Sequence, residues 1–132
     1  VLSFHSGATS AALEAAMTRP SVPQSVAFGL EALLTAILML VILRVSTGSK
    51  ERGAHAAFAV GATVFLCAVA FGPISGASMN PARSLGPAIA LLIREDLWIY
   101  ITAPVVGALA AVPLCRVLSL GAEEPNGDPL EE

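Results

Sequence analysis

Charged side chains are scarce in this chain of 132 residues. They make up 13% of it, whereas a typical soluble domain has about 25%. Hydrophobic residues reach 55%, so the chain would be hard to keep in water and we expect a membrane protein. The net charge of −3 is small, so it indicates neither a nucleic-acid partner nor attraction to an anionic surface.

Cysteine and histidine are also rare. Cys67 and Cys115 both fall in apolar stretches, where we interpret them as small buried hydrophobic residues. Their spacing indicates neither a disulfide framework nor a metal site. His5 and His55 lie far from any carboxylate with which they could pair, and no serine lies in a nucleophile motif. The sequence therefore predicts a protein that is not an enzyme and binds no cofactor or metal.

Three apolar stretches are close to the length that a membrane-spanning helix needs. They are about residues 26–45, 54–71 and 97–118. Pro104 and Pro113 interrupt the third, which a membrane helix tolerates because neighbouring groups satisfy the freed carbonyls. Glu31 lies in the first. Because an ionised carboxylate facing lipid is costly, we expect Glu31 to face the helix bundle and to have a partner there.

Basic residues indicate how the spans are oriented. One side has Arg44, Lys50, Arg52 and Arg116, and the other has Arg19 and Arg94. Since basic residues concentrate on the cytoplasmic side of a membrane, we expect residues 46–53 and the C-terminus in the cytoplasm. Residues 1–23 are then an extracytoplasmic connecting loop. Residues 120–132 are acidic and rich in turn formers, so we expect a disordered cytoplasmic tail.

The most informative motif lies between the second and third spans. Residues 75–88 read SGASMNPARSLGPA, in which Asn80 is a favoured N-cap and Pro81 is tolerated at the first helical position. The predicted helix, about residues 80–92, would be roughly 20 Å long at ~1.5 Å per residue. A bilayer core is about 30 Å thick. The motif therefore predicts a helix too short to cross, which is typical of the half-helices that line pores.

The NPAR motif within this apolar context resembles the second signature loop of the aquaporins and aquaglyceroporins, the major intrinsic protein family. The resemblance covers about residues 26–118 and implies an all-α membrane protein, with three transmembrane helices plus one re-entrant half-helix. Family members have two such inverted repeats, and this sequence has one repeat and one Asn-Pro-Ala. Because the chain also begins at Val1 rather than a methionine, we interpret it as the C-terminal half of a longer protein. A half-channel that pairs with another chain is the alternative.

The resemblance implies roles for the motif residues Asn80, Pro81, Ala82 and Arg83. The Asn80 carboxamide would turn its NH₂ group into the pore, and the half-helix dipole would repel cations. Arg83 corresponds to the arginine of the family's outer constriction. Aquaporins are themselves a standard case of channels that exclude cations and protons with an arginine and half-helix dipoles.

Two further constriction positions are small in this sequence. Ala68 occupies the place where water-selective members usually have histidine, and Ala77 falls at a loop position that is often cysteine or another small residue. A wider and less polar constriction implies passage of small uncharged solutes such as glycerol, urea or metalloid hydroxides. Glycerol facilitators, however, typically have aspartate and a basic residue where this chain has Ser84 and Ala88.

The run FGPISGASMNPARSLGPA and the segment WIYI (residues 98–101) look most like nodulin-like intrinsic proteins and their bacterial relatives. This resemblance implies a bacterial inner membrane, a homotetramer in the bilayer and a small neutral permeant. In the family, the glutamate that matches Glu31 braces the pore loop, here residues 73–79. The carbonyls of Gly76, Ala77 and Ser78 would then line the path of the permeant.

Two other functions remain open at this point. A secondary transporter also uses inverted repeats and broken helices, but it would need a site for a coupling ion, and the spans contain no carboxylate besides Glu31. A membrane-anchored fragment that conducts nothing belongs to a different class. The measured effect of Arg83→Ala on ion leak would distinguish a channel from an anchor.

Overall fold

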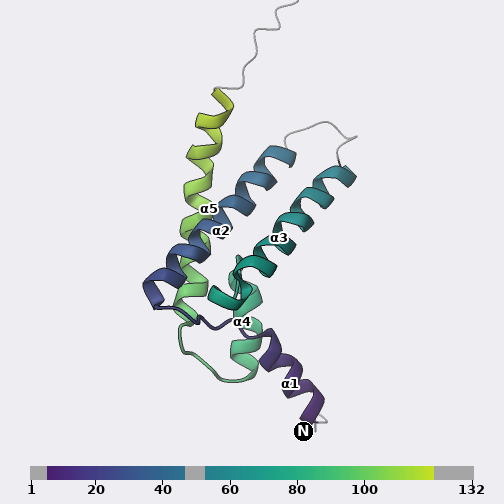
Figure 1. The fold of residues 1–132 in the computed structure, drawn as a ribbon, viewed down its shortest axis with the longest axis vertical. Coiled ribbons are helices and arrows are strands. Elements are labelled where there is room, and N and C mark those ends of the chain that lie inside the picture. The colour runs from purple at the N-terminus through teal and green to yellow at the C-terminus, as the bar shows by residue number, and fades with distance from the viewer. Residues whose placement is uncertain (1–5, 47–52, 121–132) are drawn as a thin grey trace, which may run out of the picture.

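The computed structural model describes residues 6–46 and 53–120, and these residues are helical with short connections (Figure 1). In chain order the helices are α1 (Ser6–Ala16), α2 (Gln24–Ser46), α3 (Gly53–Ser75), α4 (Pro81–Ala90) and α5 (Leu97–Leu120). α2, α3 and α5 are long and apolar enough to cross a membrane, whereas α4 has only 10 residues. The predicted all-α fold with three spans and one short helix is therefore confirmed.

Several helix ends differ from the expected ones. α3 continues through Pro73 to Ser75 instead of ending at residue 71. α4 ends at Ala90 rather than 92, because Leu92 adopts a left-handed φ of 56° that cannot continue a helix. The expected connecting loop, residues 1–23, contains α1, whose alanine-rich sequence has high helix propensity. Residues 47–52 of the predicted cytoplasmic loop and 121–132 of the predicted tail lie outside the described residues.

α2 and α5 pack closely along their middles. Ala103, Gly107 and Ala111, which recur every four residues on α5, are all buried. A Cβ atom placed on Gly107 would overlap the carbonyl oxygen of Ala32 in α2. Only glycine therefore allows the two backbones to approach this far, as small residues do in membrane helix pairs.

α3 packs against α2 and leaves many of its apolar side chains exposed. The exposed fractions of Phe58, Phe65 and Leu66 are 79%, 66% and 63%. Side chains of this kind need lipid or another apolar surface around them, because a soluble protein rarely exposes such a large apolar patch.

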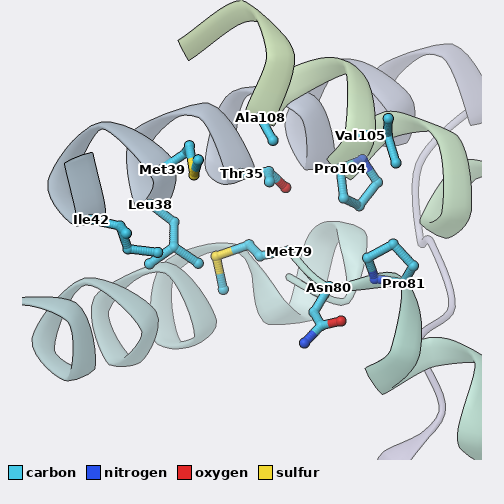
Figure 2. A pocket seen from close by; sticks show the side chains of 10 residues that line it. All are labelled: Thr35, Leu38, Met39, Ile42, Met79, Asn80, Pro81, Pro104, Val105 and Ala108. Carbon is cyan, nitrogen blue, oxygen red and sulfur yellow. The ribbon is translucent and has the colours of Figure 1, made fainter. Parts of the chain in front are cut away.

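α4 begins halfway along the bundle and returns toward one end. Asn80 and Pro81, at its start, line a cavity of about 260 Å³ with Thr35 near the middle of α2 and Ala108 near the middle of α5 (Figure 2). The helix then runs back to the end of the molecule where α5 begins and where α1 lies (Figure 1). Its 10 residues correspond to about 15 Å, half of a bilayer core. This path is that of a re-entrant half-helix.

Candidate functional site

The site is built around the connection between α3 and α4, residues 76–80, which we call the α3–α4 loop. Gly76 has a φ of 93°, and two non-glycine residues, Ala77 and Met79, have left-handed φ values of 41° and 52°. Each left-handed non-glycine residue costs of order 1–3 kcal/mol, and such conformations persist only where the surroundings hold them. Contacts to the loop must therefore outweigh this strain.

Glu31, which is fully buried on α2, makes the most extensive of these contacts. Its Oε1 accepts hydrogen bonds from the Ser75 hydroxyl at 2.9 Å and the Ser78 amide at 3.0 Å. Its Oε2 accepts from the Met79 amide at 3.0 Å. The structure thus brings Glu31 to the segment that the sequence analysis expected it to contact, and a carboxylate is the acceptor that makes such bonds strongest.

Two further contacts hold the end of α3, and sequence analysis missed both. The buried Tyr100 hydroxyl of α5 donates to the Ser75 carbonyl at 2.6 Å. Ser21, between α1 and α2, donates from its amide to the Ile74 carbonyl at 2.9 Å and from its hydroxyl to the Pro73 carbonyl at 2.8 Å. A tyrosine within an apolar span was the available signal, because a buried tyrosine hydroxyl usually has a partner.

A group of buried hydroxyls joins the loop to α4 and to the connection between α1 and α2. Thr18 Oγ1 donates to Ser84 Oγ at 2.7 Å, and Ser84 Oγ lies 2.6 Å from Ser78 Oγ. Ser78 Oγ in turn donates to the Asn80 carbonyl at 2.9 Å. Sequence analysis considered Ser84 only as a departure from glycerol facilitators, whereas here it joins α4 to the loop.

Asn80 is the N-cap of α4, as the motif predicts. Its backbone is extended, with φ −153° and ψ 116°, and its Oδ1 accepts a hydrogen bond from the Ala82 amide at 2.9 Å. Because the oxygen is held in this way, the NH₂ group is turned outward, and it donates to no other residue in the part of the chain that the structure describes. Figure 2 shows the carboxamide directed away from α2 and α5.

Arg83 lies on the first turn of α4 and reaches back over the loop. Its Nη1 donates to the Ala77 carbonyl at 2.5 Å and makes a longer contact of 3.4 Å to the Gly76 carbonyl. Two of the three carbonyls expected to line the permeant's path are therefore partners of Arg83. Each carbonyl oxygen has a second lone pair that can still accept a hydrogen bond from a solute.

Three of the predicted constriction residues share one groove. This groove, of about 520 Å³, is lined by Ala68, Asn80 and Arg83, together with apolar side chains of α2 and α3 and with Ser78 and Met79 of the loop. The side chain of Ala77 is not among them. It is fully buried with Leu34 and Cys67, so only its carbonyl oxygen is turned to Arg83, and the left-handed backbone at this position accounts for that orientation.

The groove presents hydrogen-bond donors and a positive charge. Within residues 6–46 and 53–120, no group of three or more His, Cys, Asp or Glu side chains is placed to hold a metal ion. In the same ranges every buried side-chain nitrogen or oxygen has a hydrogen-bond partner. The groove therefore offers a polar molecule hydrogen-bond donors from Asn80 and Arg83 and acceptors from the loop carbonyls.

Several known proteins are similar to this chain in sequence. Residues 1–114 match the family model described as major intrinsic protein. The chain is 50% identical over 93 residues to Aquaporin NIP3-1 of Arabidopsis thaliana, covering 70% of this chain and 29% of that protein. It is 47% identical over 93 residues to Nodulin-26 of Glycine max, covering 70% of this chain and 34% of that protein.

Aquaporin NIP6-1 of Arabidopsis thaliana matches over a longer stretch, with 43% identity over 108 residues, or 82% of this chain and 35% of that protein. The chain thus spans about a third of the length of the curated relatives it matches. The predicted resemblance to nodulin-like proteins is confirmed by these relatives. With a family model that covers most of its length and a re-entrant helix capped by Asn-Pro-Ala, this chain belongs to the major intrinsic protein family.

Proposed function

We propose that this chain supplies one of the two repeats of a passive transmembrane channel, which conducts water and small uncharged solutes and excludes ions and protons. The observation that carries the proposal is that Asn80 and Arg83, whose side chains carry hydrogen-bond donors, line one groove at the level of the α3–α4 loop. Donors at that depth replace the hydrogen bonds that a neutral solute loses when it leaves bulk water.

Charge provides the barrier to cations. The start of α4 carries about half a positive charge from the helix dipole, and Arg83 adds a full one in the same groove. A monovalent cation about 5 Å from the guanidinium is repelled by about 3 kcal/mol at an effective dielectric constant of about 20. A neutral molecule meets no such barrier, so the site discriminates by charge.

The small side chain of Ala68 supports solutes larger than water. At Ala68 the groove wall is a methyl group, which adds neither bulk nor a hydrogen-bond donor to the groove that Arg83 also lines. We therefore infer that glycerol, urea or uncharged metalloid hydroxides pass as well as water. The buried side chain of Ala77 takes no part in this selection, which rests on Ala68, Asn80, Arg83 and the loop carbonyls.

A second repeat completes the pore in this proposal. α3 exposes apolar side chains such as Phe58 and Phe65. A partner repeat would cover these side chains, and its own half-helix would meet the start of α4. Four such channels would form a homotetramer, as is usual in the family.

The three spanning helices make this an integral membrane protein. We infer that the C-terminal end of α5 lies on the cytoplasmic side, from the distribution of basic residues. The expectation of a bacterial inner membrane gains no support from the reported relatives, which are plant proteins. The proposal therefore gives the orientation of α5 in the membrane and names no particular membrane.

Arg83→Ala tests the proposal. The full product of the gene that encodes this chain is reconstituted into liposomes, and water flux, glycerol flux and proton leak are measured per channel. We expect flux in the parent and a leak that rises at least about tenfold in Arg83→Ala, since water in the groove screens part of the repulsion. Arg116→Ala, which removes an exposed charge on the last turns of α5, is the matched control.

Failure of the parent to conduct any solute would favour the alternative, a membrane-anchored fragment or a half-channel without its partner. An Arg83→Ala protein that conducts as the parent does and leaks no more than Arg116→Ala would refute the role of the arginine while leaving a channel in place.

A further inference from the structure

We propose that Thr18, which lies between α1 and α2 and outside the three spans, is a positioning residue for the constriction. It is joined to the α3–α4 loop by a chain of buried hydroxyl groups that runs through α4 and ends on the Asn80 carbonyl. The inference rests on the proposed channel function. It adds a residue from the connection between α1 and α2 to the groups that determine selectivity.

The direction of the hydrogen bonds in this chain follows from the number of protons available. A carbonyl oxygen can only accept, so Ser78 uses its single hydroxyl proton on Asn80. Ser84 must then donate to Ser78 in the 2.6 Å contact between their hydroxyls. The Thr18 hydroxyl in turn donates to Ser84. Each hydroxyl therefore donates to the next group in the chain, from Thr18 in the connection between α1 and α2 to the backbone carbonyl of Asn80.

Burial makes each bond in this chain costly to lose. The exposed fractions of Thr18, Ser78 and Ser84 are 6%, 3% and 1%, so water has little access to replace a missing partner. Hydrogen bonds that run in one direction through a dry region also polarise one another. Removal of the first donor therefore weakens the bonds that follow it.

A steric contact connects Thr18 to the Arg83 site as well. A Cβ atom placed on Gly76 would lie 3.1 Å from the Thr18 Cβ, so Thr18 packs directly on the glycine of the loop. The carbonyl of Gly76 is one of the two acceptors of the Arg83 guanidinium. Thr18 thus packs on Gly76 at one end of the loop, whose carbonyl is a partner of Arg83. It is linked to Asn80 at the other end through the hydroxyls of Ser84 and Ser78.

The chain offers variants that separate the hydroxyl from the methyl group. Thr18→Val keeps the shape and removes the donor, whereas Thr18→Ser keeps the donor and removes a methyl group. Thr102→Val makes the same chemical change at an exposed site on α5, where the hydroxyl donates to the Trp98 carbonyl of its own helix. Water flux, glycerol flux, proton leak and membrane abundance are measured for each in the full gene product in liposomes.

We expect Thr18→Val to raise proton leak per channel about fivefold, which is the change in the population of a misplaced loop when one hydrogen bond of ordinary strength is lost. Glycerol flux and abundance should change by less than about twofold, because most channels keep the native loop. Thr18→Ser and Thr102→Val should leak as the parent does. If Thr18→Val fails to reach the membrane, Ser84→Ala, which interrupts the same chain, is measured in its place with the same expectation.

Three results would overturn the inference. Thr18→Val could leak no more than Thr102→Val, or Thr18→Ser could leak as much as Thr18→Val. Either result would show that the Thr18 hydroxyl does not position the loop. Leak, flux and abundance could also fall in proportion, as they would for a residue needed only for folding. In each case the parent still conducts and the channel proposal survives, whereas a parent that conducts nothing would refute both.

Discussion

Replacement of Glu31 by glutamine tests how the strained α3–α4 loop is held. The substitution keeps the size of the side chain, removes its charge and exchanges one acceptor oxygen for an NH₂ donor. In the native protein the carboxylate accepts three hydrogen bonds, from the Ser75 hydroxyl and from the amides of Ser78 and Met79. Hydrogen bonds to a charged group contribute about 1.5–3 kcal/mol each, which gives about 5–9 kcal/mol for the three.

This stabilisation exceeds the strain that it opposes. Ala77 and Met79, the two left-handed non-glycine residues of the loop, cost together about 2–6 kcal/mol. In Glu31→Gln, the amide oxygen can take the place of Oε1 and accept two neutral bonds, worth about 1–3 kcal/mol together. The Met79 amide then faces an NH₂ group, and a buried donor without a partner costs about 1–3 kcal/mol. The net contribution falls to about zero, which no longer outweighs the strain.

We therefore expect the loop to leave its native conformation in a large fraction of Glu31→Gln channels. Proton leak should rise on the order of tenfold or more, and glycerol flux per channel should fall, since the groups that line the groove are displaced together. The assay is liposome swelling and proton leak in the full gene product, with abundance determined in parallel. Glu14→Gln makes the same change at an exposed site on α1 and should behave as the parent. A Glu31→Gln protein with native leak and native glycerol flux would refute this reasoning.

Two other substitutions test the packing and the size of the groove. Gly107→Ala should destabilise the protein by about 1–3 kcal/mol and lower its thermal unfolding temperature in detergent, because the added methyl group overlaps the Ala32 carbonyl. Gly61→Ala should leave that temperature unchanged, because an added Cβ there meets no atom within 4 Å beyond the adjacent backbone of its own helix. Equal unfolding temperatures for the two variants would contradict the close approach of α2 and α5. Ala68→His should reduce glycerol flux much more than water flux, because the ring fills part of the groove that Arg83 also lines. Swelling assays in which both fluxes fall equally would place residue 68 outside the selective part of the path.

Most of the fold follows from local features of the sequence. Long apolar stretches predict membrane spans because the bilayer requires about 20 apolar residues, and the three helices lie where those stretches occur. The Asn80 cap was also predictable, since the oxygen bonds an amide only two residues away. The helix α1 was missed because its sequence shows no apolar period, and residues 11–16 are exposed or half-buried.

The site was predictable only in part. Glu31 could be assigned a partner in advance, because a lone carboxylate in an apolar span must have one. Neither Tyr100 nor the hydroxyl chain was foreseen, since the residues joined by the Thr18–Ser84 bond are 66 positions apart. The orientation of the Ala77 side chain was not predicted either, because nothing in an alanine indicates a φ of 41°.

The sequence by itself determined that this is a membrane protein with a half-helix capped by Asn80, because composition, length and capping act within a few turns of the chain. Only the tertiary structure decided which groups face the groove. Arg83 is held on the loop carbonyls, and Ala77 is turned inward. Both outcomes depend on a strained loop that Glu31 holds from 47 positions away, and a contact of that range exists only once the helices have packed.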